Sequence, residues 1–156
     1  MQNRIRVGVL IFKENKILLV KHVHPETGYT WWVPPGGGIK DKETIFEAAI
    51  REVHEETGLK VKLNKIVYLR QFIYNEFKQN NIDIYLISKL SKGTETIENI
   101  YGKGNDENFI KELKYFSKSD LKLINVFPSI LKDQMWEDKK KGFAKIRFFG
   151  VETDKN

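Results

Sequence analysis

The chain has 156 residues, of which 40% are hydrophobic, enough to bury one well-packed core but too little for two. Its net charge of +6 favours anionic ligands in general, and because the basic residues are scattered, no dedicated nucleic-acid surface is expected. The absence of cysteine excludes disulfides and thiolate metal sites, and no apolar run approaches the ~18 residues of a membrane helix. We therefore expect a soluble, cytoplasmic protein without a membrane segment.

β-Rich segments dominate the N-terminal part of the chain. Two runs, at residues 4–12 and 16–23, are separated by residues 13–15 and predict a hairpin or two neighbouring strands. Residues 29–33 predict a third, shorter strand that leads into the run PPGGG at residues 34–38. Two prolines and three glycines are unsuited to the interior of a helix or strand, so we expect a loop. Its glycines, Gly36, Gly37 and Gly38, would let the backbone approach a substrate closely.

A helix is predicted from residue 45 to residue 57. Thr44, followed three residues later by Glu47, forms a capping box that satisfies two backbone N–H groups of the first turn. Gly58 suits the left-handed conformation that closes a helix. Apolar residues recur at helical spacing and predict a stripe that faces the core; they are Phe46, Ala49, Ile50 and Val53.

Three glutamates of this helix form the densest carboxylate cluster in the sequence. Glu52, Glu55 and Glu56 project from one face within about 100° of arc. Such a face suits a hard divalent cation, and Ala48, one turn earlier, leaves room there for a ligand. The alternative is a solvated acidic face. Like charges four residues apart cost about 0.2–0.5 kcal/mol, however, and a purely structural face would tend to interleave lysines.

The remainder of the chain predicts further strands and two late helices. Residues 61–77 and 82–90 form a long strand pair around a turn at residues 79–81, and residues 91–110 form a polar loop. A short strand at residues 113–116 precedes a short helix that begins at Ser117.

A second late helix is expected from Pro128 to the lysines that precede Gly142. We divide the chain into a domain at residues 1–142 and a tail at residues 143–156. The tail carries an additional strand at residues 143–151, which lies at the edge of its own sheet or of a partner's sheet in a homodimer.

Residues 37–59 resemble the Nudix box, GX5EX7REUXEEXGU, in which U is an aliphatic residue. Every fixed position matches; the matching residues are Gly37, Glu43, Arg51, Glu52, Val53, Glu55, Glu56, Gly58 and Leu59. Coincidence at this many specified positions is very improbable. One departure lies just outside the fixed positions: many members carry glycine before the first glutamate, where this chain has Lys42.

The resemblance implies an α/β fold, a Nudix-type α/β/α sandwich with a mixed β-sheet. It implies hydrolysis of a phosphoanhydride bond by water attack at phosphorus, with Mg²⁺ or Mn²⁺ as the cofactor. The implied metal ligands are Glu52, Glu55 and Glu56. Arg51 would orient a glutamate, and Glu43 would hold the loop or a metal-bound water.

The general base varies among relatives. One of the box glutamates, with Glu55 and Glu56 as the catalytic candidates, or an acid from a distant loop could serve. Glu107 and Glu112 lie where relatives often supply a further acid, although an acid in a polar loop is more often merely solvated.

The substrate implied by the resemblance is a nucleoside diphosphate linked to another moiety: a nucleoside triphosphate, a nucleotide sugar or a dinucleoside polyphosphate. Trp32 could stack on a base or pack in the core, and His22 could reach a phosphate or base or face solvent. Relatives specific for ADP-ribose tend to carry a proline after the box, and none lies between Pro35 and Pro128. Tyr74 is a near match to the tyrosine of relatives that act on diadenosine polyphosphates.

A non-catalytic, nucleotide-sensing regulatory module of the same fold is the alternative function. Degenerate boxes mark such modules, and the box of this chain is intact, which favours an enzyme. A role in RNA binding is disfavoured by the scattered lysines.

Overall fold

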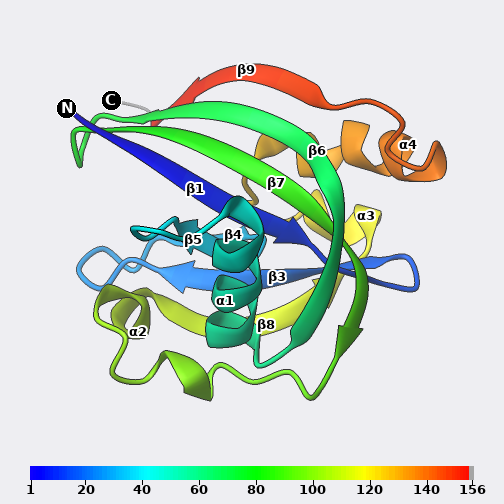
Figure 1. Cartoon of the computed structure of the whole chain (residues 1–156). Coiled ribbons are helices and arrows are strands. Elements are labelled where there is room, and N and C mark those ends of the chain that lie inside the picture. The colour runs from blue at the N-terminus through cyan, green and yellow to red at the C-terminus, as the bar shows by residue number, and fades with distance from the viewer. Residues whose placement is uncertain (155–156) are drawn as a thin grey trace.

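The computed structural model describes residues 1–154, which form two β-sheets with helices packed against them (Figure 1). The larger sheet has the strand order β5-β1-β7-β6-β9, and the smaller has β2-β3-β4 with β8 paired to the other edge of β3. The strands are β1 (Gln2–Leu10), β2 (Phe12–Lys13), β3 (Lys16–Val23), β4 (Thr30–Val33), β5 (Gly36–Gly38), β6 (Lys60–Tyr74), β7 (Gln79–Lys92), β8 (Ile110–Phe116) and β9 (Arg147–Thr153). The helices are α1 (Ile45–Thr57), η1 (Glu98–Ile100), α2 (Asn105–Phe109), α3 (Lys118–Leu121), η2 (Ser129–Lys132) and α4 (Gln134–Lys140).

The larger sheet is mixed, because β1 runs parallel to β7 and β9 runs parallel to β6, whereas its other pairs are antiparallel. Helix α1 packs on one face, where Ala49 and Val53 join Val7 and Ile84 in one apolar core. On the opposite face, residues of both sheets and of α3, η2 and α4 form a second core. The predicted α/β fold with a mixed sheet between helices is confirmed.

The prediction that the two N-terminal runs form a hairpin or neighbouring strands is wrong for most of their length. β1 pairs with β5 and β7 in the larger sheet, and only the two residues of β2 pair with β3. The chain changes sheets at Ile11, whose side chain is fully buried in the core under α1. The strand expected before the glycine run is confirmed as β4.

The long strand pair is confirmed as β6 and β7, but its turn lies at residues 75–78 rather than at residues 79–81. Asn81, expected in the turn, is a buried residue of β7 that pairs with Arg4 of β1. Pairing with β1 on one side and β6 on the other therefore overrides the turn preference of this asparagine. The polar loop contains η1 and α2, and Ile100 is buried.

The late helices differ in detail from the predicted ones. Ser117 and Asp120 form a capping box at the start of α3, as expected. The helix expected after Pro128 is divided into η2 and α4. No helix within residues 1–154 is long and apolar enough to cross a membrane.

The C-terminal strand β9 lies at the edge of the chain's own sheet, parallel to β6. Ion pairs of two arginines help to hold it there. Arg147 donates from Nε and Nη2 to Asp138 of α4 at 2.9 and 2.8 Å, and Arg70 of β6 donates to Glu152 at 2.8 Å. The tail is thus part of the same sheet as the preceding residues, and pairing of β9 with a second copy stays a prediction.

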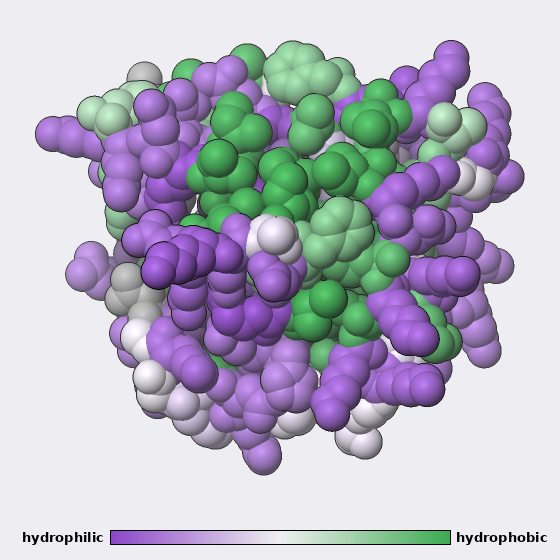
Figure 2. Space-filling model, in the orientation of Figure 1, coloured by the Kyte–Doolittle hydropathy of each residue, from purple (hydrophilic) through white to green (hydrophobic). Residues whose placement is uncertain are grey.

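Helix α1 covers only part of its face of the larger sheet. Ile5 and Ile82, which pair across β1 and β7, are 54% and 40% exposed on this face. Figure 2 shows apolar side chains gathered over the strands beside the helix.

The Asp138 contact predicts a pH-dependent contribution to stability. Tyr68 also donates to Asp138, at 2.8 Å, and the hydrogen bonds from Arg147 lower the pKa of Asp138 to about 2. Because this pKa is lower in the folded chain than in the unfolded one, the stabilisation is present above about pH 4 and is lost as the pH falls towards 2. Asp138→Asn should lower the free energy of unfolding at pH 7 by about 1–2 kcal/mol, and urea denaturation at pH 7 and pH 3 measures this.

Asp133→Asn is the matched control, since Asp133 is exposed and makes no capping hydrogen bond. The control should unfold like the wild type at both pH values. Equal destabilisation of Asp138→Asn at pH 7 and at pH 3 would contradict the assignment.

Candidate active site

Helix α1 has the predicted ends. The Thr44 hydroxyl accepts from the Glu47 N–H, the Glu47 carboxylate accepts from the Thr44 N–H, and Gly58 closes the helix at φ 73°. The predicted apolar stripe is only half correct, because Phe46 and Ile50 are each 42% exposed. The residues buried on the helix are Ala48, Ala49, Glu52, Val53, Glu56 and Thr57.

The helix is therefore rotated so that two glutamates, not Phe46 and Ile50, face the interior. Glu52 is 6% exposed and Glu56 is 2% exposed. Ala48, expected to leave room for a ligand, is fully buried in the core beneath the helix, so the space is filled by protein. The ligand-accessible side of the acids lies towards the glycine run.

The glycine run forms a strand, β5, where a loop was expected. It pairs antiparallel with β1 at the edge of the larger sheet and passes directly beneath the glutamates. A Cβ on Gly37 would lie 2.5 Å from the carboxyl carbon of Glu52, and a Cβ on Gly36 would lie 2.0 Å from the carbonyl oxygen of Val7. The N–H of Gly36 donates to Glu56 Oε2 at 3.0 Å. Only glycine allows this close approach of the strand to the helix.

Arg51 connects the glycine strand, the preceding loop and the glutamates. Its Nε and Nη2 form a bidentate pair with Glu43, and Nη2 also donates to the carbonyl of Gly38 at 3.1 Å. Its Nη1 donates to Glu52 Oε1 at 2.7 Å and to Glu55 Oε2 at 3.3 Å. One guanidinium thus fixes the orientation of three carboxylates, a role that suits its planar fork of donors.

Glu43 has the loop-holding geometry expected of it. Besides Arg51, its carboxylate accepts from the N–H of Lys40 at 2.9 Å. The hydrogen bonds from Arg51 lower the pKa of Glu43 to about 2, so it is fully charged at neutral pH. Lys42 has a left-handed backbone, with φ 69°, which accounts for the preference for glycine at this position.

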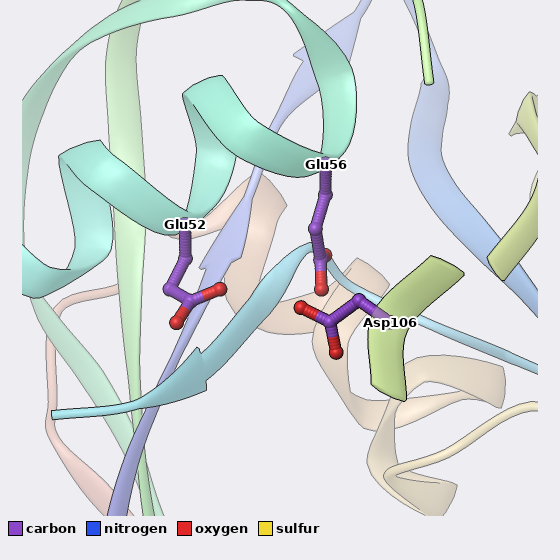
Figure 3. Close-up of side chains that lie close together, drawn as sticks. All are labelled: Glu52, Glu56 and Asp106. Atoms are coloured by element: carbon purple, nitrogen blue, oxygen red, sulfur yellow. The ribbon is translucent and has the colours of Figure 1, made fainter. Parts of the chain in front are cut away.

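A third acid completes a tight cluster with the two buried glutamates. Carboxylate oxygens of Glu52, Glu56 and Asp106 lie within 4.8 Å of one another, and Figure 3 shows the three side chains converging from α1 and α2. Burial raises the pKa of all three carboxyls, and charge repulsion by Glu52 raises that of Glu56 further. Three hard oxygen donors that repel one another fit a divalent cation, which would relieve the repulsion.

Asp106 was missed by the sequence reasoning, which considered Glu107 and Glu112 instead. The exposed Glu107 accepts from the N–H of Gly102 at 3.0 Å, and Glu112 pairs with Lys21 at 3.3 Å. Helix α2 is positioned by Phe109, whose ring contacts Trp31 and His24 edge-on. The sequence signal for this site was a short acidic segment followed by Phe109. Nothing in that segment indicates which of the neighbouring acids, Asp106 or Glu107, reaches the cluster.

The two aromatic candidates for substrate binding have different surroundings. Trp32 is 7% exposed and packs edge-on against Phe116 in the core, so the structure does not bring it to the acidic cluster. His22 stacks on Trp31 with ring centres 5.3 Å apart, and burial lowers the pKa of His22 to about 4. On the smaller sheet, the neutral His22 and the half-buried Trp31 are therefore the aromatic candidates for contact with a substrate.

The closeness of Gly37 and Glu52 predicts an effect of a single methyl group. Gly37→Ala would push the Glu52 carboxylate out of the cluster, so we expect the affinity for Mn²⁺ or Mg²⁺ to fall by about tenfold or more, as when a supporting contact of a metal site is removed. Isothermal titration with Mn²⁺ measures this.

Gly38→Ala is the control, because its Cβ would meet only the flexible end of Arg4, at 3.1 Å. This variant should bind the cation within a factor of about two of the wild type, since no ligand is displaced. Equal loss of affinity in both variants would indicate damage to the strand rather than displacement of Glu52.

Comparison with known proteins places this chain in a family. The family model described as the NUDIX domain matches residues 2–144. ADP-ribose pyrophosphatase of Methanocaldococcus jannaschii is 31% identical over 137 residues, which are 86% of this chain and 75% of that protein. Nudix hydrolase 6 of Arabidopsis thaliana is 32% identical over 99 residues, 62% of this chain and 35% of that protein.

Human diphosphoinositol polyphosphate phosphohydrolase 3-beta is 34% identical over 87 residues, 53% of this chain and 49% of that protein. The chain thus spans between a third and a half of the length of the latter two relatives. Among solved structures, the MutT protein of Methanosarcina mazei superposes with a TM-score of 0.68 at 21% identity, over 92% of this chain and 97% of that one, which shows a shared fold. The complete box, its geometry and the match over residues 2–144 establish that the chain belongs to the Nudix family.

Proposed function

We propose that this chain is a divalent-cation-dependent pyrophosphohydrolase. Its substrate is a nucleoside diphosphate linked to another moiety, and the bond cleaved is a phosphoanhydride; nucleoside triphosphates, nucleotide sugars and dinucleoside polyphosphates are the candidates. The observation that carries the proposal is the convergence of Glu52, Glu56 and Asp106 within 4.8 Å beside the glycine strand. Relatives named for pyrophosphatase activity support it.

Mg²⁺ or Mn²⁺ would be held by Glu52, Glu56 and Asp106, with Glu55 as a further ligand. The side chain of Glu55 is 15% exposed, and its charge contributes to the raised pKa of Asp106, so the two acids are neighbours. A bound cation polarises a phosphoryl oxygen, neutralises the charge of a diphosphate and lowers the pKa of a bound water.

The remaining chemistry belongs to the side chains. Water attacks phosphorus, and the bridging P–O bond breaks so that the leaving phosphate keeps the bridging oxygen and the electron pair. The proton of the attacking water goes to a carboxylate. Asp106 of the cluster and the neighbouring Glu55 are less buried than Glu52 and Glu56, and we propose that one of these two carboxylates accepts the proton. Arg51 acts as a positioning residue, because it holds Glu52 and Glu55 while Glu43 holds Arg51.

A substrate screen with matched variants tests this function. In the presence of Mg²⁺ the wild type should hydrolyse at least one compound among nucleoside triphosphates, nucleotide sugars and dinucleoside polyphosphates. Glu56→Gln and Asp106→Asn should each lower kcat/KM by about 10- to 100-fold or more, because each removes one charged oxygen donor. Glu107→Gln, on the residue next to Asp106, should retain wild-type activity because Glu107 lies outside the cluster.

Each remaining outcome of the screen is informative. If calorimetry detected nucleotide binding but no compound were hydrolysed, the result would support a non-catalytic, nucleotide-sensing module instead of an enzyme. If Asp106→Asn behaved like Glu107→Gln, Asp106 would lose its place among the ligands. Chelation of the cation should abolish hydrolysis by the wild type, and added Mg²⁺ should restore it.

The Arg51 network predicts a dependence of activity on cation concentration. Arg51→Lys keeps the charge but cannot donate to Glu43 and Glu52 in the same forked geometry. The Mg²⁺ concentration that gives half-maximal activity should rise by about tenfold, since the supporting contacts of the ligands are lost. A variant with a lower kcat but an unchanged Mg²⁺ requirement would contradict this positioning role.

A further inference from the structure

The larger sheet continues beyond α1 on the face that the helix covers. Val7 and Ile84 pack beneath the helix, and in the next row of the sheet Ile5 pairs with Ile82. Gln71 of β6 lies opposite Ile82. Paired residues of neighbouring strands point to the same side of a sheet, so this row lies on the α1 side. We call the uncovered area the open sheet face; its side chains come from residues 3–5, 71–73, 80–82 and 148–153.

Strand β9 extends the open sheet face to the edge of the sheet. Phe148 pairs with Leu69, and Val151 pairs with Gln71, so both point to the α1 side. Phe148 is 63% exposed and Val151 is 53% exposed. Together with Ile5 and Ile82 they expose an apolar area on the order of 400 Å², as large as the largest patch of a typical monomer. Figure 2 shows this apolar area as a continuous region above and beside the helix. A patch of this size indicates an interaction surface.

The open sheet face is free of charge. Within the described chain, no side chain that residues 3–5, 71–73, 80–82 and 148–153 direct to the α1 side is charged, although 31% of all residues are. Arg4 and Glu152 belong to these segments, but the alternation of the strands directs them to the opposite face. A solvated sheet face would carry lysine or glutamate at such positions, whereas depletion of charge marks the core of a protein interface.

The polar groups of this face are amides that form a row across three strands. Gln71 donates from Nε2 to Asn80 Oδ1 at 2.9 Å, and Asn80 donates from Nδ2 to Asn3 Oδ1 at 3.2 Å. An amide carries both donors and acceptors, so it can pair with an identical amide of another chain. In a two-fold interface each group meets the same set of groups on the other copy, and like charges would repel there. Apolar and amide side chains are therefore self-complementary.

We propose that the open sheet face is the interface between two copies of this chain, which pack face to face around a two-fold axis. The net charge of +6 repels two copies elsewhere, and here they meet without opposing charges. A stable interface buries about 800 Å² per partner. The open sheet face and the exposed Phe46 and Ile50 of the adjoining α1 supply roughly 600 Å² of apolar area, and the amide row brings the total close to that value.

Sedimentation equilibrium of the wild type tests the proposal. At about 100 μM, above the micromolar dissociation constants that interfaces of this size reach, the measured mass should be twice that of a single chain. Dilution should shift it towards the mass of a single chain. The acidic cluster lies beside β5, at the edge of the sheet opposite β9, so the interface leaves it accessible.

Lysine in the centre of the open sheet face should separate the copies. Ile82→Lys and Phe148→Lys should each raise the dissociation constant by about 100-fold or more, because the two-fold axis brings like charges together. Ile82→Leu should retain the dimer, and circular dichroism reports whether each variant is folded. Leu123→Lys is the matched control: Leu123 is 85% exposed and follows α3 on the other side of the sheet, so the same added charge should leave the dimer intact.

Two results would overturn the inference. A wild type that has the mass of a single chain at the highest concentration would refute self-association and assign the open sheet face to a partner of another sequence. A dimer that persists in folded Ile82→Lys and Phe148→Lys would place the interface elsewhere, such as along the outer edge of β9. Both readouts are masses in solution, so they do not depend on whether the chain hydrolyses a substrate.

Discussion

Two carboxylates buried against a strand of glycine are the constraint on which the structure of this protein depends. The side chains of Glu52 and Glu56 are almost completely buried. Without hydrogen bonds or positive charges nearby, burial would favour their neutral forms. The compensation is local: the N–H of Gly36 reaches Glu56, and Arg51 reaches Glu52. Both contacts require the strand to pass beneath the helix at a distance that excludes any side chain at Gly37. Sheet edge and helix are therefore built as one unit.

The clustering of carboxylates in this unit is electrostatically unfavourable by itself, and this is relevant to function. Arg51 supplies one positive charge, which it shares among Glu43, Glu52 and Glu55, and Asp106 adds a further acid from α2. Glu52, Glu56 and Asp106 lie close together and burial raises the pKa of each, and a divalent cation would relieve their mutual repulsion. Charge-assisted contacts to the loop hold the donors in place in the meantime, which reduces the reorganisation that cation binding requires.

Local signals in the sequence predicted the ends of the helix, because the hydroxyl of Thr44 and the flexibility of Gly58 act within one turn. They did not predict its rotation: Phe46 and Ile50 have the spacing of a buried stripe, but β5 competes for the same side of the helix and leaves them exposed. Asp106 escaped prediction for a related reason. Its place in the cluster depends on how α2 packs against the smaller sheet, a contact between segments distant in sequence, whereas the spacing within the box was readable as a pattern. The positions of most strands could likewise be predicted from the sequence. Their pairing partners could not, because they depend on contacts between segments distant in sequence.

The alternation of side chains along β1 gives its two neighbouring residues, Arg6 and Val7, different surroundings. Val7 packs beneath α1 and pairs with Gly37, whereas Arg6 lies on the opposite face and pairs with both Gly38 and Asp83. Because the period of a strand is two, a shift of register by one residue would exchange these faces and turn Arg6 towards the core under α1. The pairing that allows Gly37 to approach Glu52 is therefore the same pairing that places Arg6 beside Asp83.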